Sequence, residues 1–169
     1  MTAELPRSFF ERDVLTVAHD LVGKVLARKL PDGTVLRLRI TETEAYKGTE
    51  DTACHAHKGK TARTEVMWQH AGTVYVYLIY GIHCLLNIVT GEEDQPQAVL
   101  IRACGGYEGP GKLTKYLKID LALNRTEIPG NELWIEDDGT RPKVVTGRRI
   151  GIDYANQTDR EKEWRFIQK

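Results

Sequence analysis

Two segments of alternating apolar and polar residues, residues 24–30 and 34–45, are separated only by Pro31, Asp32 and Gly33. Proline and glycine in so short a connection are typical of a tight turn, and alternation with a period of two is typical of half-buried β-strands. The two segments therefore predict a β-hairpin, whose strands pair in the antiparallel direction. This feature restricts the chain to folds that contain an antiparallel sheet.

The rest of the chain mixes further strands with two helical segments. Strands are predicted at residues 73–80, 84–90, 97–103, 132–136, 143–151 and 164–167. The spacing of apolar residues predicts helices over residues 8–22 and 109–124, and Ser8 or Asp13 is a suitable cap for the first. This order of elements predicts an α+β fold, with an antiparallel β-sheet core, flanking helices and a protruding β-hairpin.

The size and composition of the chain favour one folded domain. Its 169 residues, 41% of them hydrophobic and 28% charged, suit a single globular domain over residues 1–169. The sequence has no run of about 18 apolar residues and no signal-peptide pattern, so we expect a cytoplasmic protein without a membrane contact. The 24 basic and 24 acidic residues cancel, which neither favours nor excludes nucleic acid as a partner.

The cysteines and histidines give little indication of a metal. Three cysteines without a CxxC spacing predict reduced thiols rather than a disulfide framework. Histidines lie near Cys54 and Cys84, but no paired spacing of a structural zinc site occurs. We therefore expect neither a metal nor another cofactor.

The strand over residues 34–45 continues into acidic residues. Continuing the alternation of Leu36, Leu38 and Ile40 places three polar side chains on the buried phase of this strand: Glu42, Glu44 and Tyr46. A buried carboxylate loses hydration, which raises its pKa and allows it to act as a general base. The alternative is a structural ion pair with Arg37, Arg39 or Arg102. A long polar segment follows, residues 47–71, and a loop of this length is often functional.

The segment "TVYVYLIY", residues 73–80, is rich in tyrosine. Alternation places Tyr75 and Tyr77 on one face, while Tyr80 lies at the hairpin tip beside Gly81, where its ring would be exposed. Aromatic residues in strands mostly contribute packing. An exposed ring at a turn is also suited to insertion between base pairs, and Tyr77 is suited to stacking on a flat ring.

Two polar residues interrupt apolar strands. Asn87 lies within Leu85–Val89, and Arg102 ends the apolar run Ala98–Ile101. If buried, each needs a hydrogen-bonding partner. They either bond to each other or line a pocket that binds the polar edge of a ligand.

With these features in place, the sequence resembles the alkyladenine DNA glycosylase family, also called methylpurine or 3-methyladenine DNA glycosylases. The resemblance is carried by the segments "ITETEAYKGTEDTACHA", "GTVYVYLIYGIHCLLNI", "AVLIRA" and "GPGKLTKYLKI", between Ile40 and Ile119. It implies a monofunctional enzyme of base-excision repair that acts as a monomer on double-stranded DNA containing damaged purines. Such an enzyme flips the damaged base out of the duplex and hydrolyses its N-glycosidic bond. Alkylated purines, hypoxanthine and ethenoadenine are the implied substrates.

The resemblance also implies roles for individual residues. Glu44 matches the general base that activates water, and Arg102 matches a residue that helps to hold base and water. The residues that match the base pocket are Tyr46, His55, Tyr77 and Asn87, and the last of these is held to exclude guanine by crowding its 2-amino group. Tyr80 matches the intercalating side chain, and DNA contacts are expected from Arg63, Gly81, Ile82 and Lys112. No lysine lies at the matched pocket positions, which favours direct hydrolysis over a Schiff base, and Glu42 is expected to be structural.

Two other classes of function remain open at this point. A non-catalytic damage-binding protein would need Tyr80 and a basic surface but no buried carboxylate. A metal-dependent hydrolase would use Cys54, His55, His57 and the glutamates, and a chelator would inactivate it.

Overall fold

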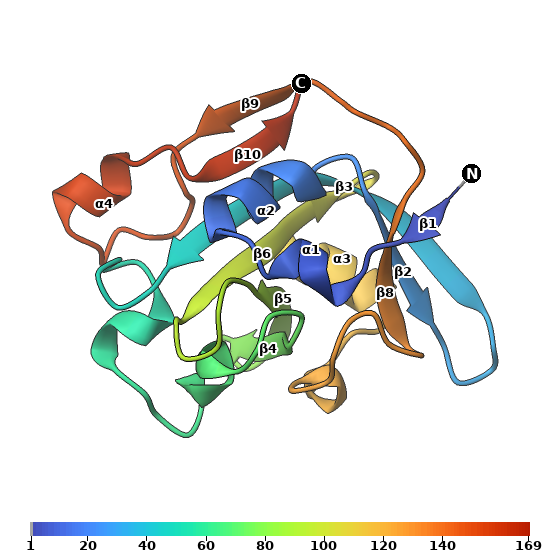
Figure 1. Cartoon of the computed structure of the whole chain (residues 1–169), viewed down its shortest axis with the longest axis horizontal. Helices are drawn as coiled ribbons and strands as arrows, with labels where there is room; N and C mark the ends of the chain where they lie inside the picture. Colours follow the sequence, from blue (N-terminus) through green and yellow to red (C-terminus); the bar gives the residue numbers. More distant parts are fainter. Residues whose placement is uncertain (1) are drawn as a thin grey trace.

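The computed structural model describes residues 2–169, which form a twisted antiparallel sheet with short helices around it (Figure 1). The strands follow the order β1-β8-β2-β3-β6-β5-β4, and β10 pairs with β3 and β9, while β7 pairs with β6. The strands are β1 (Ala3–Glu4), β2 (Val25–Lys29), β3 (Val35–Lys47), β4 (Val74–Ile79), β5 (His83–Val89), β6 (Gln97–Cys104), β7 (Tyr107–Glu108), β8 (Leu133–Asp137), β9 (Val144–Gly147) and β10 (Arg165–Gln168). All pairings between these strands are antiparallel, which confirms the predicted α+β fold.

The first helical segment is divided. The helices are α1 (Arg7–Phe10), α2 (Val14–Leu21), α3 (Pro110–Tyr116) and α4 (Gln157–Glu161), with 3-10 turns η1 (His55–Lys58), η2 (Thr64–Trp68) and η3 (Leu121–Leu123). The single helix predicted over residues 8–22 is wrong, because Asp13 has non-helical backbone angles and caps the start of a new helix. Its carboxylate accepts a hydrogen bond from the backbone N–H of Leu15 at 3.0 Å. A side-chain cap of this kind stabilises a helix start.

Other predicted boundaries also change. The helix predicted over residues 109–124 ends at Tyr116, because Lys118 adopts a left-handed conformation with φ of 52° that stops the helix. The strand predicted over residues 143–151 ends at Gly147. The following residues 148–155 leave the sheet and contact β3 and the loop after it. The strands β1 and β7 and the helix α4 were not predicted.

The main core lies between α2 and the sheet. Figure 1 shows α2 lying across β3 and β6. The buried face of α2, which includes Val17 and Leu21, packs in one hydrophobic cluster with Ile40 of β3 and Ile101 of β6. The strand β3 pairs with β2 through its first half and with β6 and β10 through its second half. This long strand therefore joins both halves of the sheet into one domain.

The pairing of β3 with β6 is irregular between Ile40 and Thr43, and this changes the direction of the residues that follow. Thr43 is buried on the α2 side and donates a hydrogen bond to the carbonyl oxygen of Ala18 at 2.7 Å. Since Ala45 also joins the core under α2, Glu44 points to the opposite side of the sheet. The prediction that Glu44 is buried is confirmed, but its predicted register with Ile40 is wrong. Irregularities of this kind redirect side chains near functional sites.

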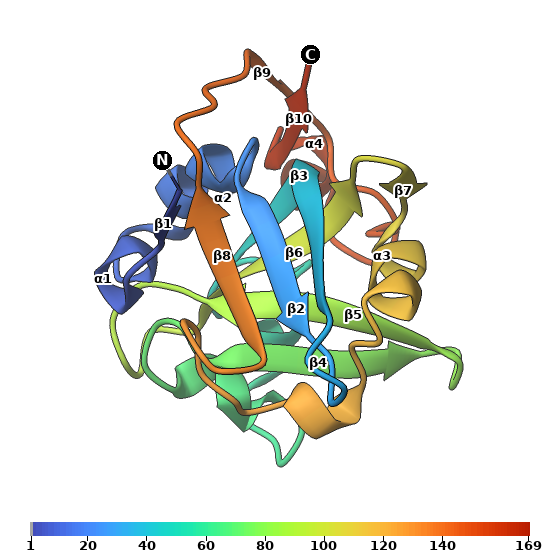
Figure 2. The same cartoon turned by 90° about the vertical axis from the view of Figure 1, so that its right-hand side faces the viewer.

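Strands β4 and β5 form the hairpin whose turn carries Tyr80. Register pairs run from Val74 opposite Ile88 to Ile79 opposite His83. Figure 2 shows both strands running together along the lower half of the molecule to a turn at its edge.

Candidate active site

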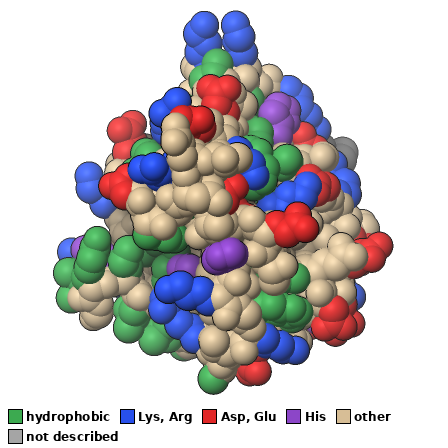
Figure 3. All heavy atoms as spheres, turned by 90° about the vertical axis from the view of Figure 1, so that its left-hand side faces the viewer, with side chains coloured by type: hydrophobic (Ala, Val, Ile, Leu, Met, Phe, Trp, Pro, Cys, Tyr) green, Lys and Arg blue, Asp and Glu red, His purple; other side chains and the backbone are tan. Residues whose placement is uncertain are grey.

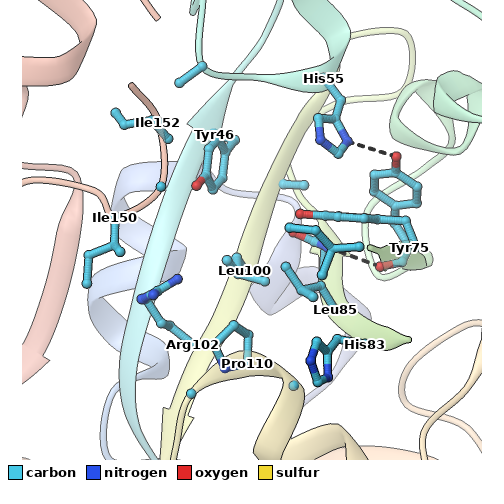
Figure 4. Close-up of a pocket in the computed structure, with 18 of the residues that line it drawn as sticks. Tyr46, His55, Tyr75, His83, Leu85, Leu100, Arg102, Pro110, Ile150 and Ile152 are labelled. Atoms are coloured by element: carbon cyan, nitrogen blue, oxygen red, sulfur yellow. Dashed lines mark hydrogen bonds between the residues drawn. The ribbon is translucent and has the colours of Figure 1, made fainter. Parts of the chain in front are cut away.

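A cavity of about 620 Å³ lies on the face of the sheet opposite α2. Its floor is formed by side chains of β4, β5 and β6, and its walls by the loop after β3, the start of α3 and residues 150–154. Figure 4 shows Tyr46, His55 and Arg102 around this cavity, with Pro110 and His83 at its lower end. The space-filling view in Figure 3 shows histidine side chains next to lysine and arginine side chains on one face of the molecule.

Glu44 lies directly behind the cavity wall, and its side chain is 0% exposed. Its Oε1 accepts a hydrogen bond from the hydroxyl of Tyr46 at 2.7 Å, and its Oε2 accepts one from the backbone N–H of Ile150 at 2.7 Å. The Nε of Arg102 lies 3.8 Å from Oε2. These three neighbours of Glu44 all line the cavity. The carboxylate is therefore adjacent to the cavity, among three residues that line it.

Burial dominates the electrostatics of Glu44. The loss of hydration raises its pKa, and Arg102, the Ile150 N–H and the Tyr46 hydroxyl oppose this by stabilising the ionised form. The same burial, followed by the nearby Glu44 charge, raises the pKa of Tyr46 well above its ordinary value. Tyr46 therefore stays neutral and acts as a hydrogen-bond donor to the carboxylate.

One wall of the cavity is aromatic. The Nδ1 of His55 and the hydroxyl of Tyr75 are 3.0 Å apart, and the ring centroids of His55 and Tyr77 are 4.6 Å apart. Burial, followed by the charge of Arg63, lowers the pKa of His55 to about 4, so its imidazole is neutral near pH 7. The guanidinium of Arg63 lies over the ring of Tyr77 at 5.1 Å from its centroid. A neutral aromatic wall of this kind can stack against a flat ligand.

The polar residues Asn87 and Arg102 both reach the cavity, but each has its own partner. The Nδ2 of Asn87 donates to the carbonyl oxygen of Tyr75 at 3.3 Å, while Arg102 approaches Glu44. Asn87 is 4% exposed. The second of the two interpretations, that both line a pocket, is the one that the geometry favours.

The hairpin turn lies apart from the cavity and is exposed. Tyr80 is 87% exposed and Ile82 is 73% exposed. Tyr80 and Gly81 both have positive φ, 54° and 68°, as the two central residues of a type I′ turn do. Glycine adopts this conformation freely, but a tyrosine there is strained, and such strain is often found at functional sites.

The other predicted site residues divide into two groups. The residues that line the cavity are Tyr46, His55, Arg63, Tyr77, Asn87, Arg102 and Lys112, and those outside it are Glu44, Tyr80, Gly81 and Ile82. Two exposed lysines, Lys112 and Lys115, line the α3 side of the cavity. The statement that lysine is absent therefore applies only to the positions that match the base pocket of the family, and not to the whole cavity. Glu42 is not at the site, and it pairs with Arg165 of β10. Glu42 therefore does not pair with Arg37 or Arg39, the partners considered for an ion pair. These two arginines pair with Glu136 and Asp138.

Residues 148–155 also contribute to the site, although no sequence pattern predicted this. Ile150, Ile152 and Tyr154 line the cavity, and the hydroxyl of Tyr154 donates to the carbonyl oxygen of Ala53 at 2.6 Å. No spacing pattern links this segment to β3, because more than 100 residues separate Ile150 from Glu44. Tyr75 could have been found, since alternation places it on the same face as Tyr77.

Two further observations concern residues 2–169. No cluster of three or more His, Cys, Asp or Glu side chains in this part of the chain has the arrangement of a metal site. No helix among these residues has the length and apolar character needed to span a membrane.

An α+β domain with a buried carboxylate beside an aromatic cavity has the arrangement of a protein that binds a flat ligand. The family model of methylpurine-DNA glycosylase matches residues 8–106 and 106–169. A protein of Psychrobacter cryohalolentis, provisionally named 3-methyladenine DNA glycosylase, is 46% identical over 93% of this chain and 87% of its own length. Proteins with the same name from Methanocella arvoryzae (46% identical, 98% and 92% covered) and Borreliella afzelii (45%, 96% and 94%) are also similar. The chain belongs to the methylpurine-DNA glycosylase family.

Proposed function

We propose that this protein is a monofunctional DNA glycosylase, which hydrolyses the N-glycosidic bond of damaged purines in double-stranded DNA and leaves an abasic site. The family assignment and the names of its relatives support the class of enzyme. The observation that carries the mechanism is the carboxylate of Glu44, buried behind an aromatic cavity. The substrates we propose are alkylated purines, hypoxanthine and ethenoadenine.

The base must leave the duplex before it can reach the cavity. Flipping costs a few kcal/mol of lost stacking and pairing, and the cost is smallest for damaged bases. Tyr80, exposed at the hairpin turn, inserts into the gap and offsets this loss by stacking on the neighbouring base pairs. The exposed residue Ile82 contacts the DNA beside it.

The flipped base stacks between Tyr77 and Tyr46, next to His55. Aromatic walls accept any flat ring, and electron-poor damaged purines stack strongly on electron-rich tyrosine. Asn87 lies on the floor of the same cavity, where its amide crowds the exocyclic 2-amino group of guanine. Because Asn87 is held by the carbonyl of Tyr75, it cannot move away without leaving a buried polar group unpaired.

Glu44 supplies the base for hydrolysis. Each carboxylate oxygen has a second lone pair beyond the hydrogen bonds from Tyr46 and Ile150, so a water molecule in the cavity can donate to it. The water oxygen attacks C1′ and its proton passes to Glu44, while the electrons of the glycosidic bond leave with the purine. Arg102, within 3.8 Å of the carboxylate, orients water and base. The anion also stabilises positive charge that develops on the sugar.

Direct hydrolysis is favoured over a Schiff base because the cavity lysines are exposed. Lys112 and Lys115 both lie on α3, where they line the cavity and are exposed to solvent. A lysine that acts as a nucleophile is usually desolvated, so that its amine is neutral. Hydrated ammonium groups in this position are instead suited to contacts with DNA phosphates.

The test is single-turnover release of base from duplexes that carry hypoxanthine or ethenoadenine, measured both with EDTA and with an added divalent metal. We expect release of the free base and an intact strand that breaks only when the abasic site is treated with alkali. Binding of both duplexes without release would instead support a non-catalytic damage-binding protein. Release that requires an added metal would support a metal-dependent hydrolase. Trapping of a covalent complex by borohydride would contradict the monofunctional mechanism.

A further inference from the structure

A buried ion pair lies behind the aromatic cavity, outside the residues to which the proposed mechanism gives a role. The Nη1 of Arg149 lies 2.6 Å from Oδ2 of Asp51, and Nη2 lies 3.0 Å from Oδ1. Their side chains are 0% and 1% exposed. Two parallel hydrogen bonds of this kind fix the relative orientation of both groups as well as their distance.

Each partner of this pair organises one wall of the cavity. Asp51 accepts hydrogen bonds from the backbone N–H groups of Lys47 and Ala53, and so shapes the loop that leads to His55. Arg149 immediately precedes Ile150, whose N–H is bonded to Glu44. The pair therefore connects the loop after β3 to the segment that covers the carboxylate.

Arg149 also contacts β3 itself. Its Nη1 donates to the carbonyl oxygen of Ala45 at 3.0 Å, between Glu44 and Tyr46 in the chain. Its guanidinium lies 5.0 Å from the ring centroid of Tyr46 and equally far from that of Trp164. These contacts with Ala45, Tyr46 and Trp164 fix the position of Arg149, and with it that of the neighbouring Ile150 N–H.

Stability alone does not account for such a pair. Two buried charges lose their hydration, and well-packed apolar residues of the same volume often stabilise a fold equally well or better. The Nε of Arg149 has no hydrogen-bond partner, which adds to this cost. An arrangement of this kind is better explained by a need for exact positions, as active sites require.

We propose that Asp51 and Arg149 form a clamp, with Arg149 as a positioning residue that holds the Ile150 N–H on the Glu44 carboxylate. The clamp also fixes the loop after β3 relative to the segment that contains Ile150. This inference rests on the proposed function, in which Glu44 is the base. The clamp acts through Ile150 and Tyr46 and does not touch the substrate. Removal of the clamp releases the carboxylate from this position, and a misplacement of about 1 Å costs about 100-fold in rate.

The charge of Arg149 gives the clamp a distinct signature. Beyond its hydrogen bonds, its positive charge lowers the pKa of Glu44, so its removal raises that pKa further. As the pH is lowered, Arg149→Gln should therefore lose its excision activity at a higher pH than the wild type does. Arg149→Lys keeps the charge but cannot reproduce both hydrogen bonds. We expect its pH profile to stay close to that of the wild type while its rate falls.

The matched control is Arg28→Gln. Arg28 lies on β2, outside the cavity, with a side chain only 10% exposed and an Nε that also lacks a partner. The experiment measures single-turnover excision against pH, the affinity for lesion DNA, the thermal midpoint, and the titration of Glu44 in the free protein by carboxyl ¹³C NMR.

The expected result is a fall of about 100-fold in the excision rate of Arg149→Gln, with less than threefold loss of affinity, and an upward shift of the Glu44 titration. Arg28→Gln should lose thermal stability without either change. Equal rates for Arg149→Gln and Arg28→Gln, or a Glu44 titration that does not move, would overturn the clamp. If the wild type excises no base, the proposed function fails, and the NMR titration alone then decides whether the clamp controls Glu44.

Discussion

Replacement of Glu44 by glutamine should abolish excision while leaving the fold and the affinity for lesion DNA intact. The contacts of the carboxylate explain why the shape survives. A glutamine amide oxygen can accept the Ile150 N–H, and its NH₂ group can donate to the hydroxyl oxygen of Tyr46, which now acts as acceptor. Neither buried partner is left unpaired, so the variant loses the base and its charge and little else.

The size of the loss follows from the two roles of the carboxylate. General base catalysis contributes about 10²- to 10⁴-fold, equivalent to roughly 3–5 kcal/mol of barrier. An anion beside the developing positive charge adds to this, because a dry site strengthens electrostatic stabilisation. We therefore expect the single-turnover rate to fall by at least about 10³-fold.

The free energy of unfolding of Glu44→Gln should not fall, in contrast to its excision rate. Burial raises the pKa of Glu44 above 4.5, its ordinary value, so the folded state binds the proton more tightly than the unfolded chain. The stability contributed by protonated Glu44 is fully present below pH 4.5 and is lost as the pH rises through the raised pKa. Glutamine does not titrate. The variant should therefore be at least as stable as the wild type at neutral pH, with an advantage that grows across this range.

The assay combines single-turnover excision, binding to an inosine duplex and thermal unfolding at pH 4 and pH 7.5. Glu42→Gln is the matched control, since Glu42 lies two residues away on β3 but pairs with Arg165 outside the cavity. This control should retain nearly wild-type excision. Comparable excision rates for Glu44→Gln and the wild type would refute the assignment of the base. Loss of binding or of stability in Glu44→Gln would refute the contact argument.

Three other perturbations test separate parts of the site. Tyr80→Ala should weaken binding to a flipped lesion by about 5- to 150-fold, the value of one aromatic stack, and equal losses on undamaged duplex would show that Tyr80 is ordinary surface. The excision rate of the wild type should fall as the pH decreases through the raised pKa of Glu44, and Tyr46→Phe should shift this fall to higher pH because a hydrogen bond to the carboxylate is lost. Identical pH–rate profiles for the two proteins would contradict this. Asn87→Ala should increase the release of undamaged guanine relative to hypoxanthine, and an unchanged ratio would remove Asn87 from discrimination.

Much of the site could be predicted because its residues lie in strands with regular alternation. The common direction of Tyr75 and Tyr77 and the exposure of Tyr80 at its turn follow from a period of two. The resemblance to the family added residues that no spacing rule connects to these strands, such as His55 and Arg63. Their placement around one cavity agrees with that resemblance.

Around Glu44, local spacing and tertiary structure determine different features of the site. Local spacing determined that β3 is a strand and that polar residues interrupt its apolar pattern, because side-chain alternation depends only on backbone geometry. Tertiary structure decided on which side Glu44 points, since the irregular pairing of β3 with β6 is set by the packing of Thr43 and Ala45 under α2. It also decided that Ile150 covers the carboxylate. Contacts across 106 residues depend on the free energy of the whole packed core and not on any local pattern.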